Sequence, residues 1–327
     1  MKIAVYEMRE DEIKEFYKAA DELKVEIVTT KEALNSVTIS FANGCDGVTT
    51  LGHSILDRDM LQQLKAMGIK YISTRSIGFN HIDIEAAKEL GLRVSNASYA
   101  PNGVADYTIM LILMTLRNYK PALWRGQVND YSLEGLQGRE MRHLTIGVMG
   151  TGKIGKTVIQ NLTGFGCKIL AYDLYQNEEV KKLATYVDLE TLYKECDVIT
   201  LHTPLLDSTY RIINKAAIEK MKRGVVLINC ARGELMNIQD IIEGIEEEKI
   251  GALGLDVFEN EEGIYHQDRR THIIKNREMA YLRQFPNVIL TQHMAFYTDE
   301  AVKSMVRCGV KSLLEFQING QSVNQIV

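Results

Sequence analysis

Residues 145–155 read Thr-Ile-Gly-Val-Met-Gly-Thr-Gly-Lys-Ile-Gly, an apolar run followed directly by a glycine-rich turn. The run predicts a buried strand, and the apolar spacing of Lys153–Leu162 predicts a helix after the turn. Gly150 permits a tight turn, Gly152 lets a ligand approach the backbone, and Gly155 allows close packing of helix on strand. The helix N-terminus offers unpaired N–H groups and positive partial charge. This arrangement predicts a phosphate-binding turn of the dinucleotide-binding type.

A carboxylate on the next expected strand supports this interpretation. Asp173 follows the strand Lys168–Tyr172 and lies 18 residues after Gly155. A carboxylate there accepts hydrogen bonds from both ribose hydroxyls of NAD and repels the 2′-phosphate of NADP. The sequence therefore favours NAD as the cofactor. An S-adenosylmethionine site and an Asp that only caps a loop are the alternatives.

Strand-like runs alternate with helical patterns along the whole chain, which predicts parallel sheets covered by helices. Because 327 residues exceed one ordinary core, we expect two domains. The expected strands of the first sheet are Ile3–Tyr6, Val25–Val28, Gly47–Thr50, Tyr71–Thr74 and Leu92–Val94. Those of the second are Leu144–Met149, Lys168–Tyr172, Val198–His202, Val225–Asn229, Gly254–Val257 and Asn287–Leu290.

Two long helical patterns define the expected domain limits. Asn102–Arg117 is apolar almost all round, so we expect it to be buried between domains. Asp299–Glu315 follows the last strand with one apolar stripe, and we expect it to cross back to the first domain. The first domain would then be discontinuous, comprising residues 1–99 and 299–327, with residues 100–298 inserted as the dinucleotide-binding domain.

Composition argues against several classes of protein. The net charge of −5, with both signs interspersed, argues against nucleic acid or a membrane surface as the main partner. No run of about 18 apolar residues would span a membrane, and no secretory signal is evident. The five cysteines form no close pair, which indicates reduced thiols and a cytoplasmic location. The charged segment Glu262–Arg283 reads as an exposed insertion, and its His266 and His272 lack the further ligands of a metal site.

Three polar residues follow expected strands of the second sheet and could form a catalytic set. They are Arg232, Glu261 and His293. A histidine can exchange the proton of a hydroxyl or carbonyl oxygen while hydride moves to or from nicotinamide. A carboxylate can orient the ring and stabilise imidazolium, and an arginine can bind a substrate carboxylate through two hydrogen bonds. From the residues alone, Glu259 and Glu262 remain alternatives to Glu261.

With these motifs in order, the chain resembles the D-isomer-specific 2-hydroxyacid dehydrogenases over its whole length. The likeness rests on 75–78 (Arg-Ser-Ile-Gly), 150–155 with Asp173, 202–204 (His-Thr-Pro), 229–233 (Asn-Cys-Ala-Arg-Gly), 256–261 (Asp-Val-Phe-Glu-Asn-Glu) and His293. Within the family, the chain most resembles the fermentative D-lactate dehydrogenases and the D-lactate-forming dehydrogenases of vancomycin-resistance clusters. The resemblance implies a Rossmann NAD-binding domain inserted in a flavodoxin-like substrate domain, an interdomain cleft and a homodimer with Asn102–Arg117 at its interface.

The resemblance also implies roles for individual residues. Arg232 would bind the substrate, His293 would be the acid/base, and Glu261, selected over its neighbours, would pair with His293. The substrate-binding residues would further include Ile77, Gly78, Tyr99 and Phe296. The cofactor-binding residues would be Gly150, Gly152, Lys153, Ile154, Gly155, Asp173, His202, Thr203, Pro204, Cys230, Ala231 and Asp256.

We therefore expect an NAD-dependent enzyme that reduces a 2-keto acid to the D-2-hydroxy acid. Around Leu51-Gly52-His53 the chain lacks the aromatic residue that some lactate-forming members place over the substrate. The substrate would thus be pyruvate or a larger branched or aromatic 2-keto acid. Glycerate or formate oxidation, and a non-enzymatic NAD-sensing interaction protein of the same fold, are the alternatives.

Overall fold

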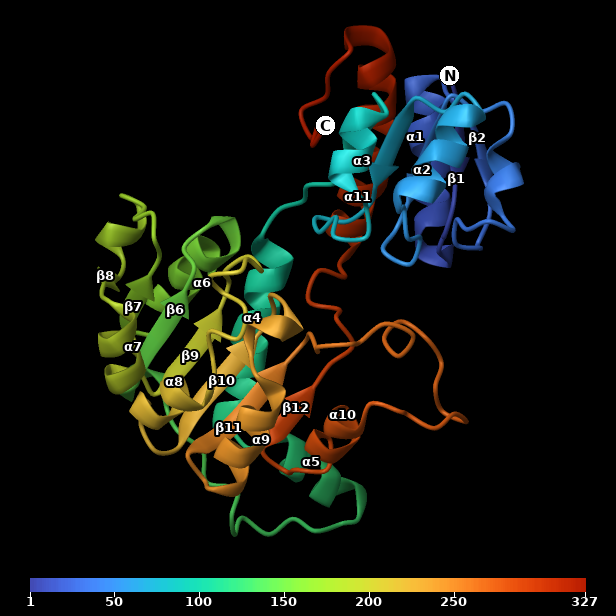
Figure 1. Ribbon diagram of the computed structural model, residues 1–327. Coiled ribbons are helices and arrows are strands. Elements are labelled where there is room, and N and C mark those ends of the chain that lie inside the picture. The colour runs from blue at the N-terminus through green and yellow to red at the C-terminus, as the bar shows by residue number, and fades with distance from the viewer. The chain divides into compact units, whose positions relative to one another are not determined.

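The computed structural model describes residues 1–327 and divides into two compact units. Unit 1 comprises Met1–Ala100 and Tyr297–Val327, and unit 2 comprises Pro101–Phe296 (Figure 1). The limits lie within one or two residues of the expected domain boundaries. Each unit contains one parallel sheet with helices on both faces, so the expected class of two doubly wound α/β domains is confirmed.

The sheet of unit 1 has five parallel strands in the order β2-β1-β3-β4-β5, which is the flavodoxin-like order. Two strands have the expected limits and three are shifted by one residue. The strands are β1 (Lys2–Val5), β2 (Glu26–Thr29), β3 (Gly47–Thr50), β4 (Tyr71–Thr74) and β5 (Arg93–Ser95).

Helices cover the two faces of this sheet. Val5 of β1 belongs to the core that α1 and α11 cover, whereas Ala4 belongs to the core that α2 and α3 cover. Adjacent residues of a strand point to opposite faces, so these cores lie on either side of the sheet. The C-terminal helix α11 packs against α1 and β4, which places it in unit 1. The helices are α1 (Ile13–Leu23), α2 (Arg58–Ala66), α3 (Ile84–Glu89) and α11 (Asp299–Asn319).

The sheet of unit 2 has seven parallel strands in the order β12-β11-β10-β9-β6-β7-β8. Strand β6, the first of this sheet in the chain, pairs with β7 on one side and β9 on the other, so the strand order reverses there, as in dinucleotide-binding folds. The strands are β6 (Thr145–Met149), β7 (Lys168–Tyr172), β8 (Thr185–Tyr186), β9 (Val198–Leu201), β10 (Val225–Asn229), β11 (Ile250–Leu255) and β12 (Val288–Leu290).

Two differences from the expected strands have clear causes. Strand β8 was not expected, because two residues are too short to show an alternating pattern. Strand β11 begins at Ile250 rather than Gly254, since Gly251 and Gly254 interrupt its apolar run. A side-chain carbon at Gly251 would lie 2.6 Å from the carbonyl oxygen of Gly224, so close packing of the backbone requires glycine here.

The helices of unit 2 also form two layers. The core beneath α4 and α6 contains Val148 of β6, and the core on the opposite face contains its neighbour Met149 together with residues of α7 to α10. The helices are α4 (Asn102–Leu116), α5 (Tyr119–Gln127), α6 (Lys153–Thr163), α7 (Leu189–Glu195), α8 (Lys215–Lys220), α9 (Ile238–Glu246) and α10 (Arg277–Leu282). No helix of the chain is both long and apolar enough to cross a membrane.

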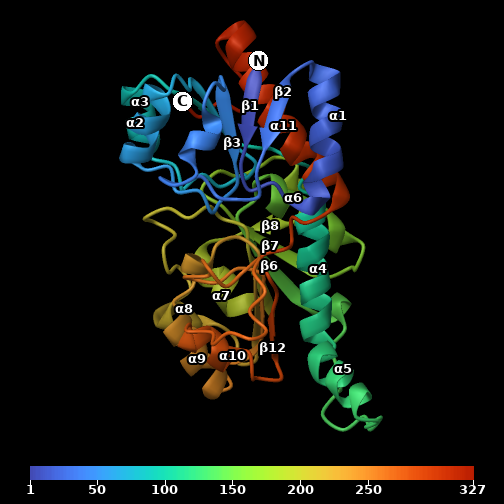
Figure 2. The same ribbon diagram turned by 90° about the vertical axis from the view of Figure 1, so that its right-hand side faces the viewer.

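Short 3-10 helices complete the chain at Glu10–Glu12, Ile39–Ala42, Met141–His143, Val180–Lys182 and Gly233–Leu235. Helix α4 packs against α6, β10 and β11 of its own unit. The sequence predicted that this helix is buried, but one side of it is partly open: Met110 and Leu113 are 38% and 36% exposed. Figure 2 shows α5 and the loop after it extending beyond the sheet layers of unit 2.

The charged segment 262–283 is only partly the exposed insertion that the sequence suggested. Its residues Asp268 and Arg270 are exposed and pair with each other. However, Met279 and Leu282 of α10 are buried, and Ile264 and Tyr265 pack against the same core. The density of charge hides these few apolar anchors, which are spaced too widely to form a pattern.

Candidate functional site

The glycine turn between β6 and α6 has the geometry that its sequence predicts. Gly150 has a φ of +91°, and a side-chain carbon on it would lie 2.6 Å from the carbonyl carbon of His202. A side-chain carbon on Gly155 would overlap with the carbonyl oxygen of Gly150. By contrast, no atom lies within 4 Å of that position at Gly152. Two glycines thus serve close packing, and the third leaves open space beside the turn.

Several polar groups around this open space could bind the phosphates and ribose of a dinucleotide. Helix α6 begins at Lys153 with no side chain capping it, so its first N–H groups remain available for an anion. The hydroxyl oxygen of Thr203 is buried and has no hydrogen-bond partner in the protein. Buried polar atoms are normally paired, so a ligand hydroxyl or phosphate would satisfy it. The residues present therefore fit NAD.

Asp173 follows β7 and lies beside the turn, as expected. Its Oδ2 accepts hydrogen bonds from the backbone N–H of Thr151, at 2.6 Å, and from the Thr151 hydroxyl, at 3.0 Å. Its Oδ1 accepts one from the backbone N–H of Tyr175. The protein thus holds the carboxylate in one orientation at the place where a ribose would bind.

The arginine turn follows β10 and depends on a buried amide. Asn229, which is fully buried, accepts a hydrogen bond from the N–H of Ala231 and donates one to the carbonyl of Arg232. A side-chain carbon on Gly233 would overlap with the backbone of Phe258, so this turn packs directly on the loop after β11. Burial raises the pKa of the neighbouring Cys230 thiol, which stays uncharged.

Glu261 and His293 form an ion pair in unit 2. The Glu261 Oε1 pairs with His293 Nδ1, and Oε2 accepts the backbone N–H of Phe258 at 2.8 Å. Both side chains are partly exposed. The pair leaves Nε2 of His293 as the ring nitrogen that can exchange a proton with a ligand. Neither Glu259 nor Glu262 makes this contact: Glu259 pairs with Arg211 instead.

Asp256 fixes the backbone that presents His293. Its carboxylate, 1% exposed, accepts hydrogen bonds from the N–H groups of Met294 and Ala295 and from the Thr291 hydroxyl. Its carbonyl accepts the N–H of His293, whose φ is +51°. An L-residue in this left-handed region needs such support from its surroundings. Asp256 therefore positions the histidine.

The strand order places the three expected catalytic residues at the same edge of the sheet. Arg232, Glu261 and His293 follow β10, β11 and β12, which are neighbours in one parallel sheet. The carboxyl ends of parallel strands lie at one edge, where such sheets bind ligands. No group of three or more His, Cys, Asp or Glu residues in the structure could hold a metal ion.

The comparisons with known proteins agree along the chain. The model of the D-isomer-specific 2-hydroxyacid dehydrogenase NAD-binding domain matches residues 109–295. An aromatic 2-oxoacid reductase of Clostridium sporogenes is 42% identical, covering 100% of this chain and 99% of its own. This chain belongs to the D-isomer-specific 2-hydroxyacid dehydrogenase family.

Solved structures of the family match equally completely. A D-2-hydroxyisocaproate dehydrogenase superposes with a TM-score of 0.91 at 34% identity, covering 100% of this chain and 99% of that one. An NAD-complexed D-isomer-specific 2-hydroxyacid dehydrogenase from Lactobacillus delbrueckii superposes with a TM-score of 0.86 at 31% identity, with complete coverage of both chains. The cofactor of this dehydrogenase is NAD.

The remaining residues expected to bind substrate divide between the units of the dehydrogenase. Ile77, Gly78 and Tyr99 lie in unit 1, and Phe296 lies in unit 2. The carbonyl of Ile77 accepts the Asn96 amide, and that of Gly78 accepts the Ser76 hydroxyl, so side chains hold this turn. The ring of Phe296 lies edge-on to that of His293, with centroids 6.3 Å apart.

His266 lies beside His293, although no sequence pattern assigned it to this site. Its Nε2 lies 3.1 Å from the carbonyl oxygen of His293, and its ring lies near those of both His293 and Phe296. The carbonyl is an acceptor, so Nε2–H of His266 donates to it. In the sequence His266 is part of the charged segment 262–283, which predicts an exposed insertion. It reaches His293 only because this long loop returns to the sheet.

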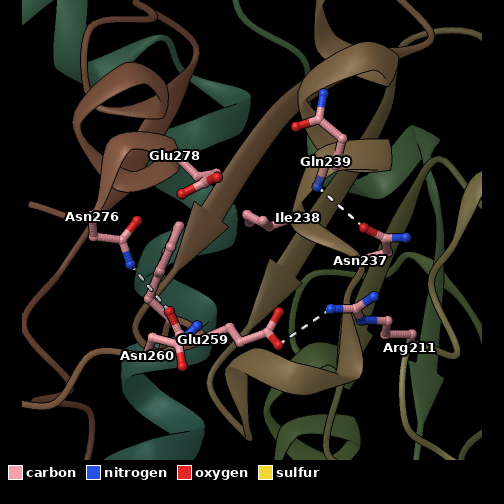
Figure 3. A pocket seen from close by; sticks show the side chains of 9 residues that line it. Arg211, Asn237, Ile238, Gln239, Glu259, Asn260, Asn276 and Glu278 are labelled. Atoms are coloured by element: carbon pink, nitrogen blue, oxygen red, sulfur yellow. Dashed lines mark hydrogen bonds and ion pairs between the residues drawn. The ribbon is translucent and has the colours of Figure 1, made fainter.

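A separate polar pocket of about 280 Å³ lies behind the loop after β11 (Figure 3). It contains none of the residues expected to bind substrate or cofactor. Its wall includes the Arg211–Glu259 ion pair, and Asn276 donates to the carbonyl of Glu259. These contacts hold the loop that carries Glu261.

Burial of His202 provides a test by pH. Burial lowers the pKa of His202 to about 3, so the ring stays neutral beside the glycine turn. In the unfolded chain this histidine has a pKa near 6.5 and takes up a proton below that pH, whereas the folded chain does not. Its neutral burial therefore carries no penalty above pH 6.5, and the free energy of unfolding decreases as the pH falls from 6.5 toward 3. Between pH 7.5 and 5 this residue alone should cost about 2 kcal/mol of unfolding free energy. We expect urea unfolding of the apoprotein to show this loss, and His202→Gln to remove it. Equal pH dependence of the two proteins would contradict the prediction.

Proposed function

We propose that this protein is an NADH-dependent reductase of 2-keto acids that forms the D-2-hydroxy acid, with His293 as the acid. The observation that carries the proposal is the Glu261–His293 pair, whose residues follow β11 and β12, next to the strand β10 that Arg232 follows. Such a set has little use in a protein that only senses NAD. Family membership supports the same activity.

In this proposal each side chain has one task. NADH, when bound, supplies the hydride that reaches the carbonyl carbon. Arg232 binds the substrate carboxylate and polarises the carbonyl. His293 donates its Nε2 proton to the carbonyl oxygen, while Glu261 holds Nδ1 and stabilises the charged ring. Asp256 keeps the backbone of His293 in place.

We infer that the preferred substrate carries a large apolar side chain. The loop from Leu51 to Ile55 has no aromatic residue, and a side-chain carbon on Gly52 would meet no atom within 4 Å. Glu7 holds this loop by accepting the N–H groups of Leu51 and His53. A fixed loop without a Phe, Tyr or Trp side chain leaves room for a branched or aromatic group. The similarity to an aromatic 2-oxoacid reductase supports this preference.

The experiment compares pyruvate, 2-ketoisocaproate, phenylpyruvate and 2-ketoglutarate by the loss of NADH absorbance. We expect phenylpyruvate or 2-ketoisocaproate to have a kcat/KM about tenfold or more above that of pyruvate, since an extra methylene in an apolar pocket contributes about 1–3 kcal/mol. A preference for pyruvate would refute the large pocket but keep the reductase. Turnover of none of the four, with NADH bound, would favour the NAD-sensing alternative.

We also propose a cytoplasmic homodimer. Ile109, Met110, Leu113 and Met114 line an apolar depression on α4, and Trp124 on α5 is 65% exposed. A second copy would cover this face through a symmetric contact, as apolar surface of this size in a soluble enzyme is normally buried. Met110→Glu should convert a dimer into monomers in sedimentation; a wild-type monomer would refute the proposal.

The proposed cytoplasmic location rests on the five unpaired cysteines, which support a reducing compartment, and cell fractionation tests it.

A further inference from the structure

The short strand β8, which no sequence pattern indicated, carries a tyrosine that reaches the glycine turn. The hydroxyl of Tyr186 donates to the Thr151 hydroxyl oxygen at 2.7 Å, and Thr151 is 2% exposed. Thr151 is the variable second residue of the glycine turn, so the motif itself assigns it no role. The contact links the edge of the sheet to the centre of the cofactor site.

The direction of every hydrogen bond in this group is fixed. The backbone N–H of Asn177 donates to the Tyr186 oxygen at 2.9 Å, so the single hydroxyl proton of Tyr186 is left for Thr151. Thr151 then has its own proton for Oδ2 of Asp173, at 3.0 Å. Each hydroxyl carries one proton. The result is a one-way chain of donors that ends on the carboxylate.

This chain determines which lone pairs of Asp173 remain for a ligand. Oδ2 receives two donors from Thr151, and Oδ1 receives one from the N–H of Tyr175. A carboxylate has about four acceptor sites, so the protein occupies three and fixes the plane of the group. One acceptor site is left, so the fixed carboxylate can accept from one ribose hydroxyl rather than from both as the sequence suggested. A 2′-phosphate is an anion, and a carboxylate held in place would repel it.

We propose that Tyr186 is a positioning residue for the cofactor, which acts through Thr151 to fix Asp173 and so maintains the preference for NADH over NADPH. The inference rests on the proposed place of NAD at the glycine turn. Its readout is binding rather than turnover. Loss of the Tyr186 proton frees Thr151 to rotate, and the carboxylate then has a second orientation that binds ribose less well.

The test measures dissociation constants of NADH and NADPH by fluorescence titration for wild type and Tyr186→Phe. A neutral hydrogen bond contributes enough to change a binding constant about three- to tenfold. We expect NADH to bind about three- to tenfold more weakly, and the NADH/NADPH affinity ratio to fall by a similar factor. The phenyl ring keeps the packing of Tyr186 against the core. Tyr193→Phe, which removes the Tyr193 hydrogen bond to the carbonyl of Ile212, is the matched control.

A double-mutant cycle distinguishes action through Thr151 from a general loosening of β8. Thr151→Val removes the relay hydroxyl, and Thr151→Ser keeps it. We expect Thr151→Val to weaken NADH binding as much as Tyr186→Phe does, and Thr151→Ser to bind NADH as the wild type does. The double variant Thr151→Val/Tyr186→Phe should have a dissociation constant for NADH within twofold of that of Thr151→Val. Independent, multiplying effects would overturn the relay.

Failure of this inference can be told apart from failure of the proposed function. If wild type binds NADH but Tyr186→Phe leaves both dissociation constants within twofold, the relay is refuted and the NAD site stands. If wild type does not bind NADH, the proposed function fails together with the inference that rests on it. Equal weakening of NADH and NADPH by Tyr186→Phe also refutes the inference, because a structural defect alone would produce it.

Discussion

Replacing His293 with Gln is expected to lower kcat for 2-keto acid reduction by about 100-fold or more, since general acid catalysis contributes about 100- to 10,000-fold. Glutamine can keep a hydrogen bond to Glu261 but cannot deliver a proton at neutral pH. Asp256 holds the backbone of residue 293 whichever side chain is present. The loss should therefore fall on the chemical step, with the dissociation constant of NADH within about twofold of wild type. Stopped-flow single turnovers measure that step directly.

His272→Gln is the matched control for this experiment. His272 is exposed in the same charged segment as His266, and its ring hydrogen-bonds to the hydroxyl of the neighbouring Thr271. Its replacement should leave kcat within twofold of wild type. If His293→Gln kept the rate within tenfold, the proton would have to come from another group. Nearby His266 would then be the first candidate, and His266→Gln would separate the two histidines.

The second large effect concerns stability and comes from the buried ion pair of Arg75 and Glu12 in unit 1. Both side chains are 0% exposed, and Arg75 Nε lies 3.0 Å from Glu12 Oε1. Arg75 also donates to the carbonyls of Tyr6 and Glu7, and its guanidinium lies over the ring of Phe16. Arg75→Met leaves the Glu12 carboxylate buried with Arg9 as a weaker partner, at 3.8 Å. We expect the free energy of unfolding to fall by about 3–5 kcal/mol, the usual effect of breaking a buried pair.

Urea unfolding measures this loss, and an exposed pair gives the matched control. Arg58 pairs with Glu89 at 2.7 Å, but their side chains are 46% and 63% exposed. Arg58→Met should therefore cost less than about 1 kcal/mol. The double variant Arg75→Met/Glu12→Leu should recover part of the stability, because it removes the unpaired charge. A similar loss for Arg58→Met and Arg75→Met would contradict the account.

Much of the NAD-binding unit could be predicted because its signals are local. The turn at residues 150–155 needs glycine where the backbone is too close for a side chain, and such glycines are visible in the sequence alone. Strands β7 and β10 have the expected limits, since a strand buried on both faces is a continuous apolar run. Strand β8 and helix α10 were missed because each has too few buried residues to produce a period.

The site could be predicted only where a motif carries it. Arg232 and His293 follow strands and could be selected from the sequence, but Glu261 was chosen over its neighbours only by family resemblance. His266 lies beside His293 through the path of a long loop, which spacing does not encode. The motif at 75–78 assigned no structural role to Arg75, because its ion-pair partner Glu12 is 63 residues away in the sequence. The Tyr186 relay likewise needs the pairing of β7 with β8.

The most direct test of the central claim is the product formed from phenylpyruvate and NADH, analysed by chiral chromatography beside the NADH consumed. We expect one molecule of phenyllactate for each NADH oxidised, all of it the D enantiomer, and about 1% of that amount or less with His293→Gln over the same time. Phenyllactate of the L configuration, or oxidation of NADH without hydroxy acid, would contradict the account.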